Sequence, residues 1–254
     1  MNGVDLSHYQ EGLDLSALKR GGYSFAILKL SEGRGIADAS FDKFYDMAQS
    51  HGIPVGAYVY SHATNASVAQ AEAVYALSLL KGRVLQLGIY MDVETVGQMQ
   101  IPKAQLAETV KAFCATVNRA GYDAGIYGSE YNAWSRLSPE DLGEYLIWIA
   151  HYGKEPDLPC DIWQKTDKGT FPGYNGPVDV DEVRSGRMRE LVDGMPIPDP
   201  ETEREQDAET TAIVRMLQAC MSQNGFWPAD QCDGVKSAEF RKTFVEYANA
   251  VAKS

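Results

Sequence analysis

The sequence of 254 residues has no long apolar run and little positive charge. No stretch approaches the roughly 18 consecutive apolar residues of a membrane-spanning helix, so we expect no membrane insertion. The first residues, MNGVDLSHYQ, lack a basic segment followed by an apolar one, so no signal peptide is predicted. Lysine and arginine number 23 against 35 aspartates and glutamates, a net charge of −12. Such a chain repels polyanions, which excludes nucleic acid as a partner.

Cysteine and histidine are also few. The four cysteines include no C-x-x-C pair, and the four histidines are scattered along the chain, so we predict neither a metal site nor a cofactor. Cys220 and Cys232 lie 12 residues apart and could form a disulfide, although reduced thiols are the favoured reading. The sequence leaves the oligomeric state open.

Eight short apolar runs alternate with longer helical patterns. Continuous apolar character is typical of strands that are covered on both faces, as in parallel sheets. The runs are residues 3–5, 25–30, 54–60, 87–94, 124–129, 145–152, 161–166 and 177–183. Helices are predicted over residues 16–22, 39–52, 65–82, 101–121 and 138–145.

Eight strands with about five helices predict an α/β fold over residues 1–195, a shortened (β/α) TIM-like barrel that has lost its last helices. An open doubly wound sheet is the alternative, but no glycine-rich phosphate loop follows the first run. Residues 196–209 hold three prolines and six acids against one arginine, which predicts a linker. Apolar residues then recur at helical spacing, and a small all-α module is predicted over residues 210–254.

Acidic and aromatic residues stand at or near the ends of these runs. In a parallel barrel the loops after the strands converge at one rim, so we expect these side chains to share one pocket. The acids are Asp5, Asp92, Glu94 and Asp179, and the other residues are Lys29, Tyr58, Tyr60, Tyr127, Trp148, Tyr152, Trp163 and Gln164. Aromatic faces cover the apolar faces of sugars and carboxyl groups transfer protons, so the pattern indicates a carbohydrate site.

Asp92 and Glu94 in the segment YMDVE point to the same side of a strand, because successive side chains alternate. Two carboxyl groups that close cannot both ionise cheaply, so the pKa of one is raised. A protonated acid beside an ionised one is what cleavage of a glycosidic bond requires. We assign the general acid to Glu94, which has the longer reach. The alternative, a pair of salt-bridged or capping acids, is disfavoured by the acids at other strand ends.

Eight segments in order resemble the motifs of the family-25 glycoside hydrolases, the Chalaropsis-type lysozymes that include many phage endolysins. They are GVDLSHYQ, ILKLSEG, GIPVGAYVYS, YMDVE, GIYGS, LIWIAHY, IWQKTDKG and GPVDVDEV, within about residues 1–190. The resemblance implies N-acetylmuramidase activity, which is cleavage of the β-1,4 bond between N-acetylmuramic acid and N-acetylglucosamine in peptidoglycan, with retention of configuration and without a cofactor.

The resemblance also implies roles for single residues. Glu94 matches the general acid, and Asp92 matches a second essential acid that acts as nucleophile or orients the acetamido group of the substrate. Asp5 and Asp179 match supporting members of the acidic cluster. Positions that line the sugar groove are matched by Tyr58, Tyr127, Trp148 and Gln164. Lys165 departs from the family, which usually has a tyrosine after Trp-Gln, and this puts one groove contact in doubt.

Other readings stay open at this point. Residues 214–247 resemble, more weakly, a helical peptidoglycan-binding module, and a plain helical cap or dimerisation element fits nearly as well. A phage-encoded enzyme would be made in the host cytoplasm and released to the cell wall with a holin, and secretion by another route is the alternative. A chitinase-like hydrolase of N-acetylglucosamine polymers and a non-catalytic glycan-binding barrel are the competing functions.

Overall fold

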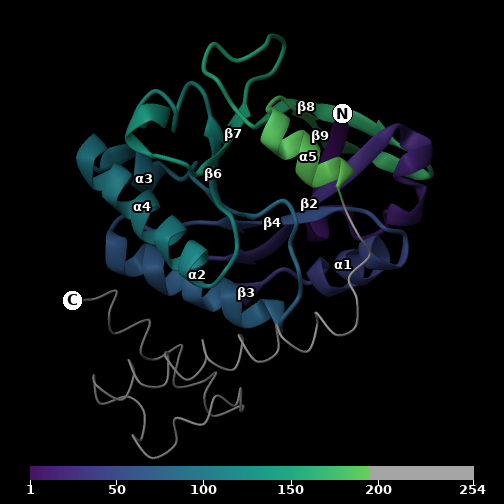
Figure 1. Ribbon diagram of the computed structural model, residues 1–254, viewed down its shortest axis with the longest axis horizontal. Helices are drawn as coiled ribbons and strands as arrows, with labels where there is room; N and C mark the ends of the chain where they lie inside the picture. Colours follow the sequence, from purple (N-terminus) through teal and green to yellow (C-terminus); the bar gives the residue numbers. More distant parts are fainter. Residues whose placement is uncertain (195–254) are drawn as a thin grey trace, which may run out of the picture.

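Eight strands close into a barrel in residues 1–194, the part of the chain that the computed structural model describes (Figure 1). Around the ring they are β1 (Asn2–Leu6), β2 (Tyr23–Glu32), β4 (Val55–Tyr60), β5 (Ile89–Asp92), β6 (Ala124–Ser129), β7 (Leu146–Ala150), β8 (Ile162–Phe171) and β9 (Tyr174–Val183). Because β9 pairs with β1, the predicted barrel is confirmed and the open sheet is wrong. The predicted linker, the helical module, Cys220 and Cys232 lie outside the described residues.

The barrel ends in an antiparallel hairpin. Strands β1 to β8 pair in parallel around the ring, whereas β9 runs antiparallel to both β8 and β1. A tight turn at Gly173, with φ of 79°, joins β8 to β9 and makes a crossover helix unnecessary. This explains why the last helices of a complete barrel are missing. A ninth strand, β3 (Ile36–Ala37), was not predicted and pairs with β2 outside the ring.

Three of the five predicted helices are present. They are α1 (Phe41–Ser50), α2 (Ala66–Leu80) and α4 (Lys103–Arg119). The helix predicted over residues 16–22 is two 3₁₀ turns, η2 (Leu15–Ala17) and η3 (Lys19–Gly21), because so short a segment cannot offset the nucleation cost of an α-helix. Over residues 138–145 only the 3₁₀ turn η4 (Pro139–Asp141) forms, since Gly143 adopts φ of 70° and breaks the pattern.

Three further helical segments were not predicted. The 3₁₀ turn η1 (His8–Gln10) follows β1, and α3 (Val96–Gln100) follows the acid pair Asp92 and Glu94. The helix α5 (Gly186–Asp193) follows β9, with Ser185 capping it through a hydrogen bond to the N–H of Met188. None of the described helices is long and apolar enough to span a bilayer.

Alternation of side chains divides the core in two. Outward residues of β2 to β6, such as Leu28 and Met91, pack against α1, α2 and α4, which line the outside of these strands (Figure 1). Inward residues form a second cluster inside the barrel, where Phe25, Tyr90 and Leu146 are fully buried. Large inward rings need small neighbours, because a Cβ at Gly125 would lie 2.4 Å from the ring of Tyr90.

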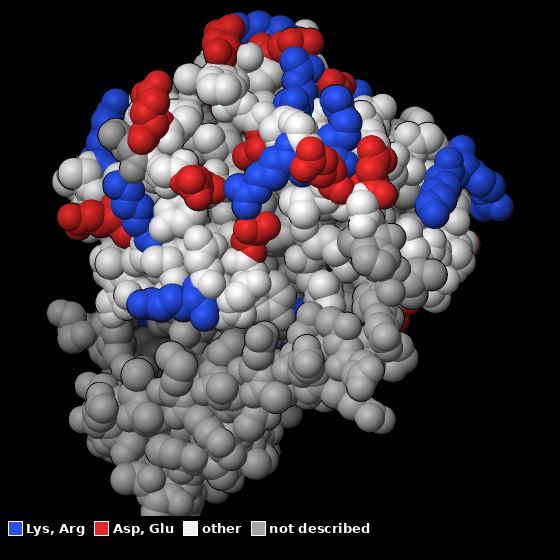
Figure 2. Space-filling model, in the orientation of Figure 1, with Lys and Arg blue, Asp and Glu red and all other residues white. Residues whose placement is uncertain are grey.

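The helix α5 closes the end of the barrel at which β9 ends. Its Met188 and Val192 pack into the inner cluster with Phe25 and Val183, and Figure 1 shows the helix lying across the strands. On this face, as Figure 2 shows for the described residues, basic and acidic side chains are intermixed. Arg187, for example, bonds to Asp123 over 2.8 Å. One end of the barrel is therefore sealed by apolar packing, which leaves the opposite rim for a site.

Candidate active site

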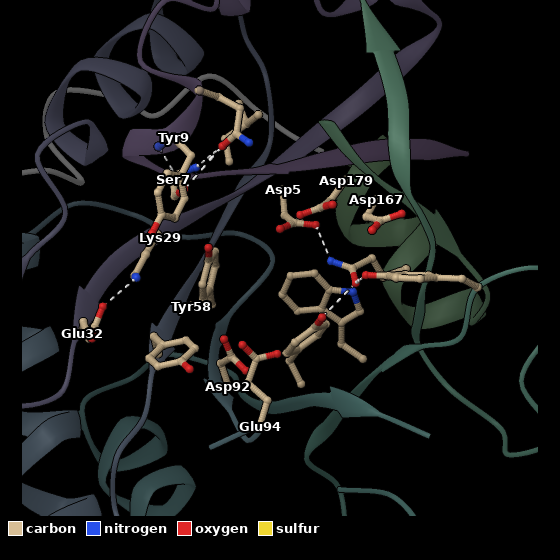
Figure 3. Close-up of a pocket in the computed structure, with 17 residues that line it drawn as sticks. Asp5, Ser7, Tyr9, Lys29, Glu32, Tyr58, Asp92, Glu94, Asp167 and Asp179 are labelled. Carbon is tan, nitrogen blue, oxygen red and sulfur yellow. Dashed lines mark hydrogen bonds and ion pairs between the residues drawn. The ribbon is translucent and has the colours of Figure 1, made fainter. Parts of the chain in front are cut away.

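A pocket of about 520 Å³ opens at the rim where the parallel strands end (Figure 3). Eleven of the twelve site residues predicted from the sequence line it: Asp5, Lys29, Tyr58, Tyr60, Asp92, Glu94, Tyr127, Trp148, Tyr152, Gln164 and Asp179. Those on strands share the inward face of the barrel, since their immediate neighbours along the strands lie in the outer core. The expectation that distant strand ends converge is thus met in the geometry.

Trp163 is the one predicted residue that the fold does not bring into the pocket. It is next to Gln164 on β8, so it points to the opposite face of the barrel wall. Its indole N–H donates to the carbonyl of His151 over 2.8 Å, and its ring lies 5.4 Å from the guanidinium of Arg184. Trp163 therefore belongs to the outer wall, which corrects the prediction. Lys165, on the same face, bonds to Asn2 and Glu182, so this departure from the family lies away from the pocket.

Asp92 and Glu94 lie together in the pocket but differ in exposure. Asp92 ends β5 and is only 4% exposed, and its Oδ1 has no hydrogen-bond partner among the described residues, whereas Glu94 is exposed. Burial, and next the charge of Glu94, raise the pKa of Asp92 well above its usual range. Burial also raises the pKa of Glu94. The ammonium of Lys29 lowers this pKa, and the charge of Asp179 raises it further. Since Asp92 is the more buried, the proton of the pair favours Asp92 until something covers Glu94.

A second group of acids lies where the first and last strands pair. Asp5 of β1 faces Asp179 of β9, and Asp181 follows on the same inward face of β9. Burial raises the pKa of Asp5 well above its usual range, and the charges of Asp181 and Asp179 add to this. Burial likewise raises the pKa of Asp179 to about 6 and that of Asp181 to about 8. The group therefore holds protons near neutral pH.

Asp181 was not among the acids chosen from the sequence. It is fully buried and accepts a hydrogen bond of 2.8 Å from the indole N–H of Trp148. The D-V-D spacing in GPVDVDEV could have identified Asp181, because residues two apart on a strand share a face and Asp179 was already predicted to face inward.

Gln164 connects the acids to the aromatic wall. Its amide nitrogen donates to Oδ2 of Asp5 over 2.8 Å, and its Oε1 accepts the hydroxyl groups of Tyr127 at 2.8 Å and Tyr152 at 2.9 Å (Figure 3). Two phenol donors fix the amide orientation, so the amide N–H must face Asp5. The ring of Tyr127 packs against that of Trp148, with centroids 4.4 Å apart. The wall is thus held rigidly from three strands.

An ion pair forms the opposite side of the pocket. The ammonium of the buried Lys29 lies 3.1 Å from Oε2 of Glu32 and 5.0 Å from the ring centroid of Tyr60. Glu32 was missed in the sequence, because simple alternation from Lys29 places Ser31 inward instead. A shift of the β2–β4 register between Lys29 and Ser31 brings Glu32 beside Tyr60.

Five further residues line the pocket without having been singled out. They come from the end of β1, the segment after it and the β8–β9 hairpin, and are Leu6, Ser7, Tyr9, Gln10 and Asp167. Ser7 and Gln10 cap each other across η1, which shapes the segment that presents Tyr9. No group of His, Cys, Asp and Glu within residues 1–194 is arranged to hold a metal ion. Carboxyl groups of unequal proton affinity between aromatic rings can instead perform acid catalysis on a sugar acetal.

The sequence matches a known protein family and several of its relatives. The family model of the glycosyl hydrolases family 25 matches residues 4–174. An autolytic lysozyme of Clostridium acetobutylicum is 28% identical over 204 residues, which are 79% of this chain and 60% of the relative. Lysozyme M1 of Streptomyces globisporus is 28% identical over 212 residues, which are 76% of this chain and 70% of that one. The chain thus spans about 60% of the length of the first relative.

A solved structure is similar in fold. The catalytic domain of endolysin ply40 from bacteriophage P40 of Listeria monocytogenes aligns with a TM-score of 0.67 at 22% identity. The alignment covers 76% of this chain and 97% of that domain. At this identity the likeness concerns the barrel itself.

Proposed function

Since the chain belongs to the glycosyl hydrolases family 25, we propose that it hydrolyses the β-1,4 bond between N-acetylmuramic acid and N-acetylglucosamine in peptidoglycan. The observation that carries this proposal is the meeting of Asp5, Asp92, Glu94 and Asp179 in one pocket with aromatic walls. The rings of Tyr127 and Trp148 suit the apolar faces of sugars, and the carboxyl groups suit the proton transfers.

Glu94 is the proton donor in this proposal. It lies at the open side of the pocket, where the leaving sugar has to depart, and its pKa is already raised by burial and by Asp179. A glycan chain that covers Glu94 removes water from it and raises that pKa further. The proton then passes from Glu94 to the glycosidic oxygen as the carbon–oxygen bond breaks.

Asp92 is the residue that positions the substrate for the reaction in this proposal. Its buried Oδ1, which lacks a partner among the described residues, is available to the substrate. Burial raises the pKa of Asp92 well above its usual range, and a carboxyl group that keeps its proton is a weaker nucleophile than a carboxylate. This favours the reading in which Asp92 orients the acetamido group, which attacks the anomeric carbon, over direct attack by Asp92. Water then attacks the same carbon and breaks the bond to the acetamido oxygen, and Glu94 regains its proton from that water.

Asp179 raises the pKa of Glu94, and Asp5 faces Asp179 across the pair of β1 and β9. The sugar is held by Lys29, Tyr58, Tyr60, Tyr152 and Gln164. Residues 1–195 form the catalytic unit, and residues 210–254 are proposed to bind the cell wall beyond the linker at 196–209.

The site of action is the cell wall, which the chain reaches after holin-dependent release if it is phage-encoded. With a net charge of −12, attraction to anionic wall polymers cannot be electrostatic, so wall binding should weaken little as salt rises.

Digestion of purified peptidoglycan tests the proposal. Mass spectrometry with and without prior borohydride reduction should find new reducing ends on N-acetylmuramic acid. Glu94→Gln should lower the rate at least about 10²-fold without changing the melting temperature. Glu108→Gln, at an exposed position on α4 that does not line the pocket, should leave the rate unchanged. Reducing ends on N-acetylglucosamine, cleavage of chitin oligomers in place of peptidoglycan, or full activity of Glu94→Gln would each overturn it.

A further inference from the structure

A second pocket of about 520 Å³ lies beside the candidate active site, and the two share one wall. Glu32 lines both pockets. The second pocket is formed by the β2–β3 turn and the segment between β4 and α2, and the residues that matter here are Arg34, Ile36, His62, Asn65 and Val68. Nothing in the chemistry proposed so far uses it.

The shared wall is held from both sides. Oε2 of Glu32 pairs with the ammonium of Lys29 in the active site at 3.1 Å, and Oε1 lies 3.1 Å from Nε2 of His62 in the second pocket. The position of His62 is fixed in turn by buried Glu72, whose Oε1 accepts the backbone N–H of His62 at 3.1 Å and whose Oε2 accepts the hydroxyl of Ser61 at 2.5 Å. Glu32 and His62, whose side chains are 34% and 53% exposed, are thus held in place by contacts on both sides of the shared wall.

The lining of the second pocket differs from that of the active site. No Tyr, Trp or Phe is found among the described residues that line it, whereas five tyrosines and one tryptophan line the active site. It contains instead the guanidinium of Arg34, whose charge also acts on Glu72, the imidazole of His62, and the apolar side chain of Ile36, which is 63% exposed. Asn65 accepts the N–H of Val68 through Oδ1, a bond that does not use its amide nitrogen.

These groups match a peptide better than a sugar. Arginine and an amide nitrogen pair with carboxylates and peptide carbonyls, and an exposed isoleucine covers small aliphatic side chains, whereas sugar rings are bound on aromatic faces. In peptidoglycan the lactyl group of each N-acetylmuramic acid carries a short peptide with free carboxylates. A sugar held in the active site must direct this peptide out of the pocket, and the adjoining pocket lies across Glu32.

We propose that the second pocket binds the peptide stem of the muramic acid held in the active site. This deepens the proposed function and rests on it. Arg34 engages a stem carboxylate, and Ile36 covers the stem's small side chains. The enzyme thereby recognises muramic acid by its peptide as well as by its sugar.

The test compares uncross-linked glycan chains that carry peptide stems with the same chains after an amidase has removed the stems. The wild type should cleave the stem-bearing chains with a kcat/KM about tenfold higher. Arg34→Gln combined with Ile36→Ala should abolish this difference by lowering kcat/KM on the stem-bearing chains only. Arg20→Gln, an equal loss of charge at an exposed position away from the pocket, should change neither value.

Equal loss on both substrates would mean that the second pocket binds a further sugar or supports the fold, and would overturn the proposal. So would a double variant that keeps the wild-type preference. Binding of a muramyl dipeptide and of N-acetylmuramic acid to Glu94→Gln, measured by calorimetry, decides the matter independently of cleavage. The dipeptide should bind about tenfold more tightly, and addition of the double substitution should remove that gain. If no chain is cleaved but the dipeptide is still preferred, the proposed reaction fails while the stem site stands.

Discussion

The indole N–H of Trp148 lies 2.8 Å from Oδ1 of Asp181 and donates to it at the floor of the active site. Both side chains are buried, and the ring of Trp148 also contacts Tyr58, Tyr90 and Tyr127. One hydrogen bond thus connects the aromatic wall to the acids of the last strand. Asp181 is buried and does not line the pocket, so it can act on a bound sugar only through its contacts with Asp5 and Trp148.

Asp181→Asn should flatten the dependence of stability on pH. Folding raises the pKa of Asp181 to about 8, so the folded state binds its proton more tightly than the unfolded state. The stabilisation is complete below the ordinary pKa of aspartate near 4 and is lost as the pH rises through about 8. Asparagine keeps the acceptor for Trp148 and does not titrate. The unfolding free energy of the wild type should therefore fall by on the order of a few kcal/mol more than that of the variant between pH 5 and 8.

Urea unfolding at several pH values measures this difference. Glu108→Gln, which removes an exposed acid, should reproduce the wild-type curve. Parallel curves for the wild type and Asp181→Asn would show that Asp181 is ionised in the folded protein.

Lys29→Met and Asp179→Asn should move the alkaline limb of the activity profile in opposite directions. Lys29 lowers the pKa of Glu94 and Asp179 raises it. If Glu94 is the general acid, loss of the ammonium should shift the limb of kcat/KM to higher pH, and loss of the carboxylate should shift it to lower pH, each by about half a unit to one unit. Lys29→Arg should leave the limb in place. Shifts of the same sign would exclude Glu94 as the group that controls this limb.

Trp163→Phe should leave the reaction unchanged, whereas Trp148→Phe should impair it. Trp163 lies on the outer wall, and its loss removes a hydrogen bond to His151 worth about 1 kcal/mol of stability. Loss of the Trp148 indole N–H leaves buried Asp181 without its donor, and kcat/KM should drop about tenfold or more. Steady-state kinetics on soluble peptidoglycan fragments decide this. If both changes raised KM equally, Trp163 would contact the substrate after all, and its placement on the outer wall would be wrong.

Gly125→Ala should destabilise the barrel by about 1–3 kcal/mol. An added Cβ would lie 2.4 Å from the ring of Tyr90 and 2.9 Å from the Cβ of Leu146, and neither can move freely in the packed interior. Gly12→Ala is the matched control, because no atom lies within 4 Å of its added Cβ. Chemical denaturation compares the two. Equal stability would show that the inner core can rearrange around the extra methyl group.

Much of the site could be predicted because strand side chains alternate with a period of two. Continuous apolar runs marked the strands, and the same alternation places Asp92 with Glu94 inside the barrel. The same alternation predicts that Trp163 and Gln164, as neighbours on one strand, face opposite sides. Both were nevertheless predicted to line the groove, because they were chosen by residue type alone. Glu32 was beyond this reasoning, since a local register shift in β2 breaks the alternation.

The end of the barrel could not be predicted from run length and composition. A strand has no direction in its hydropathy pattern, so nothing in residues 177–183 distinguished the antiparallel β9 from a parallel one. The helix α5 was missed because it is short and its two buried residues, Met188 and Val192, lie inside the barrel and not between helices. In both cases long-range packing determines the structure, and local propensity does not.

Closure of the ring between β1 and β9 has a consequence for the newborn polypeptide. Asp5 leaves the ribosome first, and Asp179, which faces it across the seam, leaves only when almost all of the described chain has been made. A nascent fragment can carry Asp92 and Glu94 and still have no complete acid cluster. Contacts between such distant residues also form late and slowly. A chain still being synthesised therefore lacks the complete acid cluster until β9 has been made and has paired with β1.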